Sequence, residues 1–230
     1  MMLSDMRSPE FDGTAGRMLL AVPLGATEQH GPHLPLGTDT AIAVELCRRL
    51  ADRVPDIVVA PPIPYGSSGE HAGFPGTLSI GHAALRLLVV ELARSADAFA
   101  GLIVVNGHGG NIVPLRAAER LLHEEGRRVL IWSPSGPADD SHAGHTETSA
   151  MLHLDPRHVD LDTAEPGNTE PLNRIIGRLR EHGVGAVSPN GVLGDPTRAT
   201  AASGEAILDE WTRSLVRAAR TFGSAPGPRT

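Results

Sequence analysis

The stretch MLLAVPLG (residues 18–25) decides the fold, because it is an apolar run of strand length that ends in glycine. Residues 40–54, TAIAVELCRRLADRV, follow it with the spacing of an amphipathic helix. The same order of apolar run and helical pattern recurs along the chain. Further strands are predicted at 56–63, 101–107 and 128–133, with a candidate edge strand at 183–188, and further helices at 82–99, 113–126, 147–154, 171–183 and 204–222.

Apolar strands that alternate with helices are typical of a parallel sheet covered on both faces. We therefore expect an α/β protein, a three-layer sandwich with a mainly parallel central sheet and helices on both faces. The 230 residues, of which 40% are hydrophobic, fit one domain over residues 18–222. The polar residues 1–17 and the tail 223–230 are expected to be flexible.

Composition narrows the class of partner and the compartment. The formal net charge is −7 and no basic run is present, which argues against nucleic acid or an anionic membrane as partner. The single cysteine, Cys47, excludes an internal disulfide framework and a thiolate zinc site, and its helical setting indicates a packing residue. The polar start has no signal-peptide pattern, and no apolar stretch reaches the roughly 20 residues that span a bilayer. We expect a cytoplasmic protein.

Four polar, glycine-rich loops follow the predicted strands. In open α/β sheets ligands bind beyond the carboxyl ends of the strands, so these loops should meet on one rim. They cover residues 25–39, 64–77, 106–111 and 133–149.

The first loop, GATEQHGPHLPLGTD, is unusually rich in groups that bind metals. It holds Glu28, His30, His33 and Asp39. Carboxylate and imidazole ligands together suit Zn, Mn or Fe(II). An equally open alternative for Asp39, or for its neighbour Thr38, is that it caps the following helix.

Two other loops contribute histidines and a carboxylate. His108 lies in NGHGGN, where the glycines permit close approach of a ligand, although a plain strand-to-helix turn is the alternative. DDSHAGHTETS holds His142, His145 and Glu147. Glu147 could instead be a first-turn carboxylate that favours the helix dipole, and the two histidines could be solvated. The chain has neither a dinucleotide fingerprint nor a G-x-S-x-G nucleophile elbow.

The second loop, PYGSSGEHAGFPGT, contains Ser68, Glu70 and His71. These residues either line a substrate pocket or belong to a compact surface loop, and the sequence assigns them no role.

Four ordered motifs, GATEQHGPHLPLGTD, GEHAGFPGTLSI, NGHGGN and HAGHTETS, together resemble the creatininase family of metal-dependent amidohydrolases. The resemblance spans roughly residues 19–220. It implies an α/β fold, hydrolysis of C–N amide bonds, a homo-oligomer (often a hexamer), and two divalent metal ions per chain (Zn, Fe(II) or Mn).

The resemblance also implies roles for individual residues. Glu28, Asp39 and His108 would bind one metal, and His30, Asp39 and Glu147 the second, with Asp39 bridging. His142 would be the catalytic histidine. Creatininase itself resembles NGHYEN where this chain has NGHGGN, and there the glutamate contributes to the second metal. Because Gly110 stands at that place and cannot ligate, Glu147 is the candidate substitute.

The motifs GEHAGFPGTLSIG, HAGHTETSAMLHL and GVLGDPTRATAASGEAI resemble the branch of this family that belongs to the mycofactocin system. That resemblance implies a peptidase that releases a modified C-terminal Val-Tyr dipeptide from a modified ribosomal peptide. Two alternatives remain open, namely a hydrolase of small cyclic or formyl amides such as creatinine or a formamidopyrimidine, and a non-catalytic metal-binding subunit.

Overall fold

The computed structural model describes residues 1–11 and 16–224. Its sheet contains four parallel strands in the order β2-β1-β3-β4, namely β1 (Leu19–Leu24), β2 (Ile57–Val59), β3 (Gly101–Asn106) and β4 (Val129–Trp132). Strand β1 is buried along its whole length, as its unbroken apolar sequence predicts.

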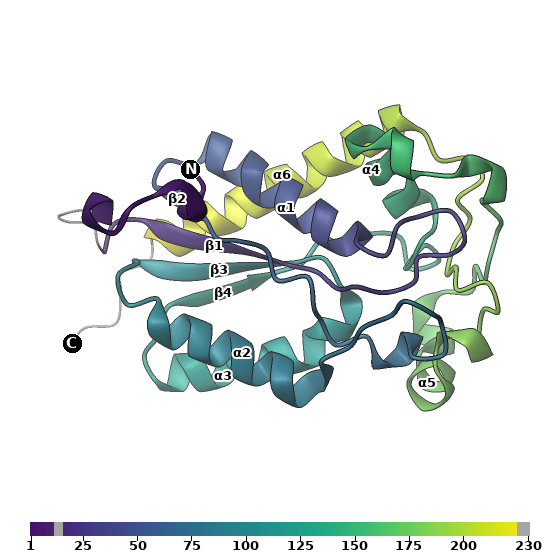
Figure 1. The fold of residues 1–230 in the computed structure, drawn as a ribbon, viewed down its shortest axis with the longest axis horizontal. Helices are drawn as coiled ribbons and strands as arrows, with labels where there is room; N and C mark the ends of the chain where they lie inside the picture. Colours follow the sequence, from purple (N-terminus) through teal and green to yellow (C-terminus); the bar gives the residue numbers. More distant parts are fainter. Residues whose placement is uncertain (12–15, 225–230) are drawn as a thin grey trace.

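Helices cover both faces of the sheet (Figure 1). One face carries α1 (Thr38–Arg53) and α6 (Ala201–Ser224), and the other carries α2 (Gly81–Ser95) and α3 (Ile112–Glu124). Alternate side chains of each strand enter two separate cores. Leu19 and Ala21 pack with α1 and α6, whereas Leu20 and Val22 pack with α2 and α3. The expected three-layer α/β sandwich is confirmed.

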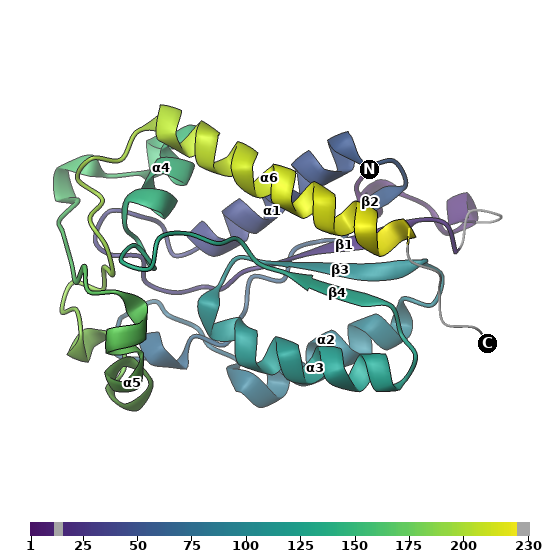
Figure 2. The same cartoon turned by 180° about the vertical axis from the view of Figure 1, so that it is seen from behind.

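Two further helices lie beyond the carboxyl end of the sheet, as both views show (Figures 1 and 2). Helix α4 (His145–Leu154) packs against α6, and α5 (Leu172–His182) lies near the 3-10 turns of Gly69–His71 and Val184–Ala186. These elements frame the rim on which the strand-end loops meet.

The candidate edge strand at 183–188 is wrong. Gly183 adopts φ +79°, and Val184–Ala186 forms a 3-10 turn. The amide of Val187 donates to the carbonyl of Val184, so this bond closes a turn rather than a ladder. Val184 is buried with Ile175 and Leu179 of α5, which explains the apolar residues that suggested a strand.

The chain ends are described in part. Residues 12–15 and 225–230, on which the expected flexible segments partly fall, lie outside the described residues. Residues 1–11 lie near the edge strand, where the amide of Val59 donates to the carbonyl of Met1. Across residues 1–11 and 16–224, no helix is both long and apolar enough to cross a membrane.

The contact between α4 and α6 depends on a glycine. A Cβ at Gly204 would collide with the backbone carbonyl of Ser149 in α4. Alanine normally stabilises a helix interior relative to glycine by about 1 kcal/mol. We expect Gly204→Ala to destabilise the fold instead, by about 1–3 kcal/mol, because the two helices must separate.

Gly177 in α5 provides the matched control, since a Cβ there would meet no atom within 4 Å. Gly177→Ala should therefore stabilise the protein by up to about 1 kcal/mol. Urea unfolding of both variants measures the two effects. Equal and positive shifts of the midpoint would contradict the proposed close approach of α4 and α6.

Candidate metal centre

The six residues that sequence motifs single out as ligands or catalyst meet on the rim beyond the strands. Glu28 and His30 lie on the loop after β1, and Asp39 lies in the first turn of α1. The remaining three are His108 after β3, His142 on the loop after β4, and Glu147 in the first turn of α4. The strand-end loops thus converge as predicted, and they bring all six residues to the same rim.

Two groups of candidate ligands share Asp39. In the first, His108 Nδ1 lies 3.1 Å from Glu28 Oε1 and 3.4 Å from Asp39 Oδ2. In the second, His30 Nε2 lies 3.0 Å from Asp39 Oδ1 and 3.9 Å from Glu147 Oε2. Within each group the ligand atoms lie within 4.8 Å of one another. Asp39 presents one oxygen to each side, which is the geometry a bridging carboxylate needs.

His142 lies beside the same cluster. Its Nδ1 is 3.7 Å from Glu28 Oε1, and its ring centroid is 4.4 Å from that of His30. Glu28, His30 and His142 together also satisfy the spacing of a metal site. Geometry therefore allows His142 to act either as a ligand or as a proton carrier, and metal analysis must separate the two.

The buried carboxylates demand positive charge. Glu28 has no exposed surface, and its carboxylate faces histidine rings, with His108 Nδ1 3.1 Å and His71 Nε2 3.3 Å from Oε1. Burial raises the pKa of Glu28, but the charge and hydrogen bond of His108 outweigh burial and hold that pKa well below its usual range. Asp39 is likewise buried, and its Oδ2 lies 3.4 Å from His108 Nδ1. A buried anion is costly unless it is paired or coordinates a cation.

The same buried carboxylates shift the pKa values of the histidines in the two groups. Burial lowers the pKa of His30, yet Asp39 overcomes this and raises it to about 10. The pKa of His108 is raised well above its usual value, since Glu28 outweighs the burial. Burial raises the pKa of Glu147 to about 7 despite the opposing charge of His30. The raised pKa values of His30 and His108 thus reflect the negative charge of the buried carboxylates that face them.

A divalent metal fits this set of donors. Imidazole nitrogens and carboxylate oxygens converge within 4.8 Å of one another in each group, and the carboxylates of Glu28 and Asp39 are buried there. Such a mixed set suits Zn, Mn or Fe(II).

A buried glutamine connects two histidines of the site. The ring Nε2 of His142 lies 2.8 Å from the backbone carbonyl of Gln29, which indicates that Nε2 carries the proton and donates it there. The side-chain amide of Gln29 then has its two hydrogens for His71 Nδ1, at 2.9 Å, and for the carbonyl of Gly191, at 3.0 Å. This network leaves His142 Nδ1 as a free lone pair that faces Glu28, and it places the proton of His71 on Nε2.

His71 and Gln29 are site residues to which the motifs assign no role. His71 is buried, and its Nε2 lies 3.3 Å from Glu28 Oε1. Its signal is present in the sequence, because His71, like His108, follows a strand within a glycine-rich loop. Gln29 carries no such signal, since an amide between two candidate ligands has no distinctive pattern.

Two other histidines of the motifs lie elsewhere. His33 is buried, but its Nε2 pairs with the Thr148 hydroxyl at 2.8 Å, outside both ligand groups. His145, the first residue of α4, is half-buried and lies outside both groups as well.

Asp39 and Glu147 each had an alternative role at the start of a helix, as an N-cap for Asp39 and as a first-turn carboxylate for Glu147. The N-cap of α1 is Gly37, which has no side chain, so neither Asp39 nor Thr38 is the capping residue of this helix. Glu147 lies in the first turn of α4, and its Oε2 accepts a hydrogen bond from the amide of Ala143 at 2.6 Å in addition to its contact with His30. Ala143 has φ +52°, so this bond also supports a strained turn between His142 and α4.

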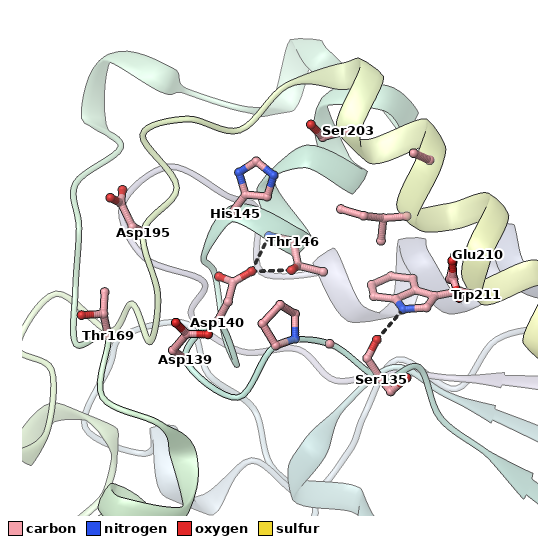
Figure 3. A pocket seen from close by; sticks show the side chains of 14 residues that line it. Ser135, Asp139, Asp140, His145, Thr146, Thr169, Asp195, Ser203, Glu210 and Trp211 are labelled. Atoms are coloured by element: carbon pink, nitrogen blue, oxygen red, sulfur yellow. Dashed lines mark hydrogen bonds between the residues drawn. The ribbon is translucent and has the colours of Figure 1, made fainter.

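Two cavities border the region. The larger, about 680 Å³, lies between the loop after β4, α4 and α6, and His145 and Trp211 are among its lining residues (Figure 3). In Figure 3 the Asp140 carboxylate accepts hydrogen bonds from Thr146, and the Trp211 indole donates to Ser135. None of the six ligand or catalyst candidates lines it. The second, about 610 Å³, is lined by Gln29, which touches His142 and His71.

An α/β sandwich with a buried His/carboxylate cluster at its strand ends has the donor groups that could hold a divalent metal. A family model described as creatininase, creatinine amidohydrolase, matches residues 4–219. The chain belongs to the creatininase family. A solved structure named "Creatininase Mn" superimposes with a TM-score of 0.81 at 28% identity, over 97% of this chain and 99% of the other.

Two relatives differ in their similarity to the chain. The mycofactocin precursor peptide peptidase of Mycolicibacterium smegmatis is 57% identical over 201 residues, which are 84% of this chain and 80% of that protein. The creatinine amidohydrolase of Pseudomonas putida is 32% identical over 179 residues, which are 64% of this chain and 68% of that protein.

The loop after β3 approaches α1 through another glycine. A Cβ at Gly107 would lie 2.6 Å from the carbonyl oxygen of Asp39, so Gly107→Ala should push His108 and Asp39 apart. We expect this variant to retain less divalent metal after dialysis than the wild type.

Gly109→Ala is the control two residues away, because a Cβ there meets nothing within 4 Å. Elemental analysis of both purified variants measures the bound metal. Equal metal content in both would show that the spacing between Gly107 and Asp39 does not govern the site.

Proposed function

We propose that this protein is a metal-dependent peptidase that cleaves a modified precursor peptide of the mycofactocin type and releases its modified C-terminal Val-Tyr dipeptide. The observation that carries the proposal is the pair of ligand groups that share Asp39, with His142 beside them. The 57% identity to the peptidase of Mycolicibacterium smegmatis supports the choice of substrate.

The ligand sets suggest two divalent ions per chain, with Glu28, Asp39 and His108 around one and His30, Asp39 and Glu147 around the other. Ions bound there would supply Lewis acidity toward the amide carbonyl and lower the pKa of water. Zn, Mn and Fe(II) all suit these donors.

His142 is positioned to carry a proton. Burial, with the charges of His30 and His71, holds the pKa of His142 well below its usual value, so its ring is neutral. With Nε2–H donated to Gln29, Nδ1 accepts a proton from the attacking water and delivers it to the amide nitrogen as the C–N bond breaks. A positioned acid–base group of this kind contributes about 10²–10⁴-fold to the rate.

The cavity of about 610 Å³ is the better entrance for a peptide, because Gln29 lines it and contacts His142. Phe74, Pro75 and Leu36 make part of its wall apolar. Such a wall suits the aromatic end of the proposed substrate.

Two alternatives explain less. A hydrolase of small cyclic or formyl amides shares the metal centre, but the creatinine amidohydrolase of Pseudomonas putida is only 32% identical. A non-catalytic metal-binding subunit leaves the neutral, oriented His142 without a purpose. The cytoplasmic location and the homo-oligomer, a hexamer in the family resemblance, stay predictions.

Chelation tests the proposed function directly. Metal-free protein should not cleave the modified peptide, and activity should return with a divalent metal. The metal-free protein should also melt at a lower temperature than the metal-bound protein, because a ligand that binds only the native state stabilises that state. Chromatography of the cleaved peptide and thermal melting are the measurements. Full activity of protein shown to be metal-free by elemental analysis would exclude this mechanism.

The roles of Asp39 and His142 separate under substitution. Asp39→Ala should lose both metals, since it removes the shared carboxylate. His142→Ala should keep about two metals per chain and turn over about 10²–10⁴-fold more slowly. Metal content and single-turnover rates decide the matter. A His142→Ala variant that loses one metal would make His142 a ligand, as the spacing of Glu28, His30 and His142 permits.

A further inference from the structure

The space above Gly110 is filled by a carboxylate from another loop. A Cβ at Gly110 would collide with Glu70 Oε1, with His108 Nε2 and with the backbone carbonyl of Ser67. Any larger residue at this position would displace the loop after β2, the ring of His108, or both. The absence of a side chain at Gly110 is therefore a condition for the observed position of Glu70.

The two nitrogens of His108 face different surroundings. Nδ1 faces inward, 3.1 Å from Glu28 Oε1 and 3.4 Å from Asp39 Oδ2. Nε2 faces the opposite loop, 3.1 Å from the carbonyl of Ser67 and 3.5 Å from Glu70 Oε1. The carbonyl of Ser67 and the carboxylate of Glu70 are acceptors, so they would hold the proton of His108 on Nε2 when Nδ1 binds a cation in the ligand group. That tautomer leaves the lone pair of Nδ1 directed at the ligand group.

We propose that Glu70 is a positioning residue for the metal centre: its carboxylate, in the space that Gly110 leaves open, holds the ring of His108 with Nδ1 toward Glu28 and Asp39. The inference rests on the proposed metal centre and adds a residue outside both ligand groups. Groups that accept the second N–H of a ligating histidine fix its tautomer and orientation, and their loss typically weakens metal binding about 10–100-fold.

The surroundings of Glu70 favour this role over a merely solvated side chain. Its side chain is only 20% exposed, and its carboxylate lies 3.5 Å from Nε2 of His108. The adjacent His71 faces Glu28 Oε1, so one short turn contributes contacts to two candidate ligands of the same metal.

Metal binding to purified, metal-free protein tests the proposal without an activity assay. We would titrate Zn²⁺ against a chromophoric chelator and record the visible spectrum of the Co²⁺ form. Glu70→Ala should weaken one metal equivalent about 10–100-fold and change the Co²⁺ spectrum, because His108 is released. Glu70→Gln keeps an acceptor for Nε2–H and should restore part of the affinity.

Three further variants control the interpretation. Gly110→Ala should reproduce the Glu70→Ala spectrum, since the added Cβ occupies the place of the carboxylate, whereas Gly109→Ala should resemble the wild type. Glu205→Ala removes an equal charge from an exposed position on α6 and should leave both metals unchanged. Circular dichroism of each metal-free variant establishes that it is folded.

The outcomes distinguish the two proposals. Wild-type affinity and an unchanged Co²⁺ spectrum in Glu70→Ala, with two metals bound, would overturn the role of Glu70 alone. A folded wild-type protein that binds no Zn²⁺ or Co²⁺ would overturn the metal centre itself, and the role of Glu70 with it. If Glu70→Gln is as impaired as Glu70→Ala, the charge rather than the acceptor orients His108, which contradicts the hydrogen-bond argument.

Discussion

A carboxylate with no exposed surface is the constraint around which the rim is organised. Glu28 has to face positive charge, because an uncompensated buried anion would cost several kcal/mol. Three histidines from three different loops, His71, His108 and His142, lie within 3.7 Å of one of its oxygens. The strands β1, β2, β3 and β4 are parallel, so the loops that follow them meet at one edge of the sheet, around Glu28.

Close approach of the loops depends on glycine and on two buried amides. A Cβ at Gly107 would press on the carbonyl of Asp39, and one at Gly66 would press on Asn111. Asn111 accepts from the amide of Ser67 and donates to Asn106 and to the carbonyl of Gly25, which ties the loops after β1, β2 and β3 to one another. The candidate ligands are therefore held in place by the loops themselves, as a preorganised site requires.

The different roles proposed for Asp39 and His142 follow from their charges. Asp39 is shared by both ligand groups, whereas His142, desolvated beside two other histidines, is kept neutral. A neutral imidazole with one nitrogen tied to Gln29 has a single lone pair to offer, and that lone pair faces the cluster. The same site thus contains groups suited to bind cations and one suited to carry a proton.

The sequence by itself determined the layers and the rim. The apolar run at β1 and the three that follow it predict buried parallel strands, and their order predicts which loops meet. The sequence also identified five candidate ligands, because metal-binding side chains among glycines are unusual at strand ends. They are Glu28, His30, Asp39, His108 and Glu147.

Tertiary structure decided which side chains turn inward. His33 lies closer in sequence to Glu28 than His71 does, yet His33 pairs with Thr148 and His71 faces Glu28. The valines at 184 and 187 read as a strand, but they pack against α5 as a turn because a glycine with positive φ redirects the chain. Glu70 reaches His108 only because position 110 has no side chain. Such contacts depend on the packing of residues distant in the chain, which a local pattern does not encode.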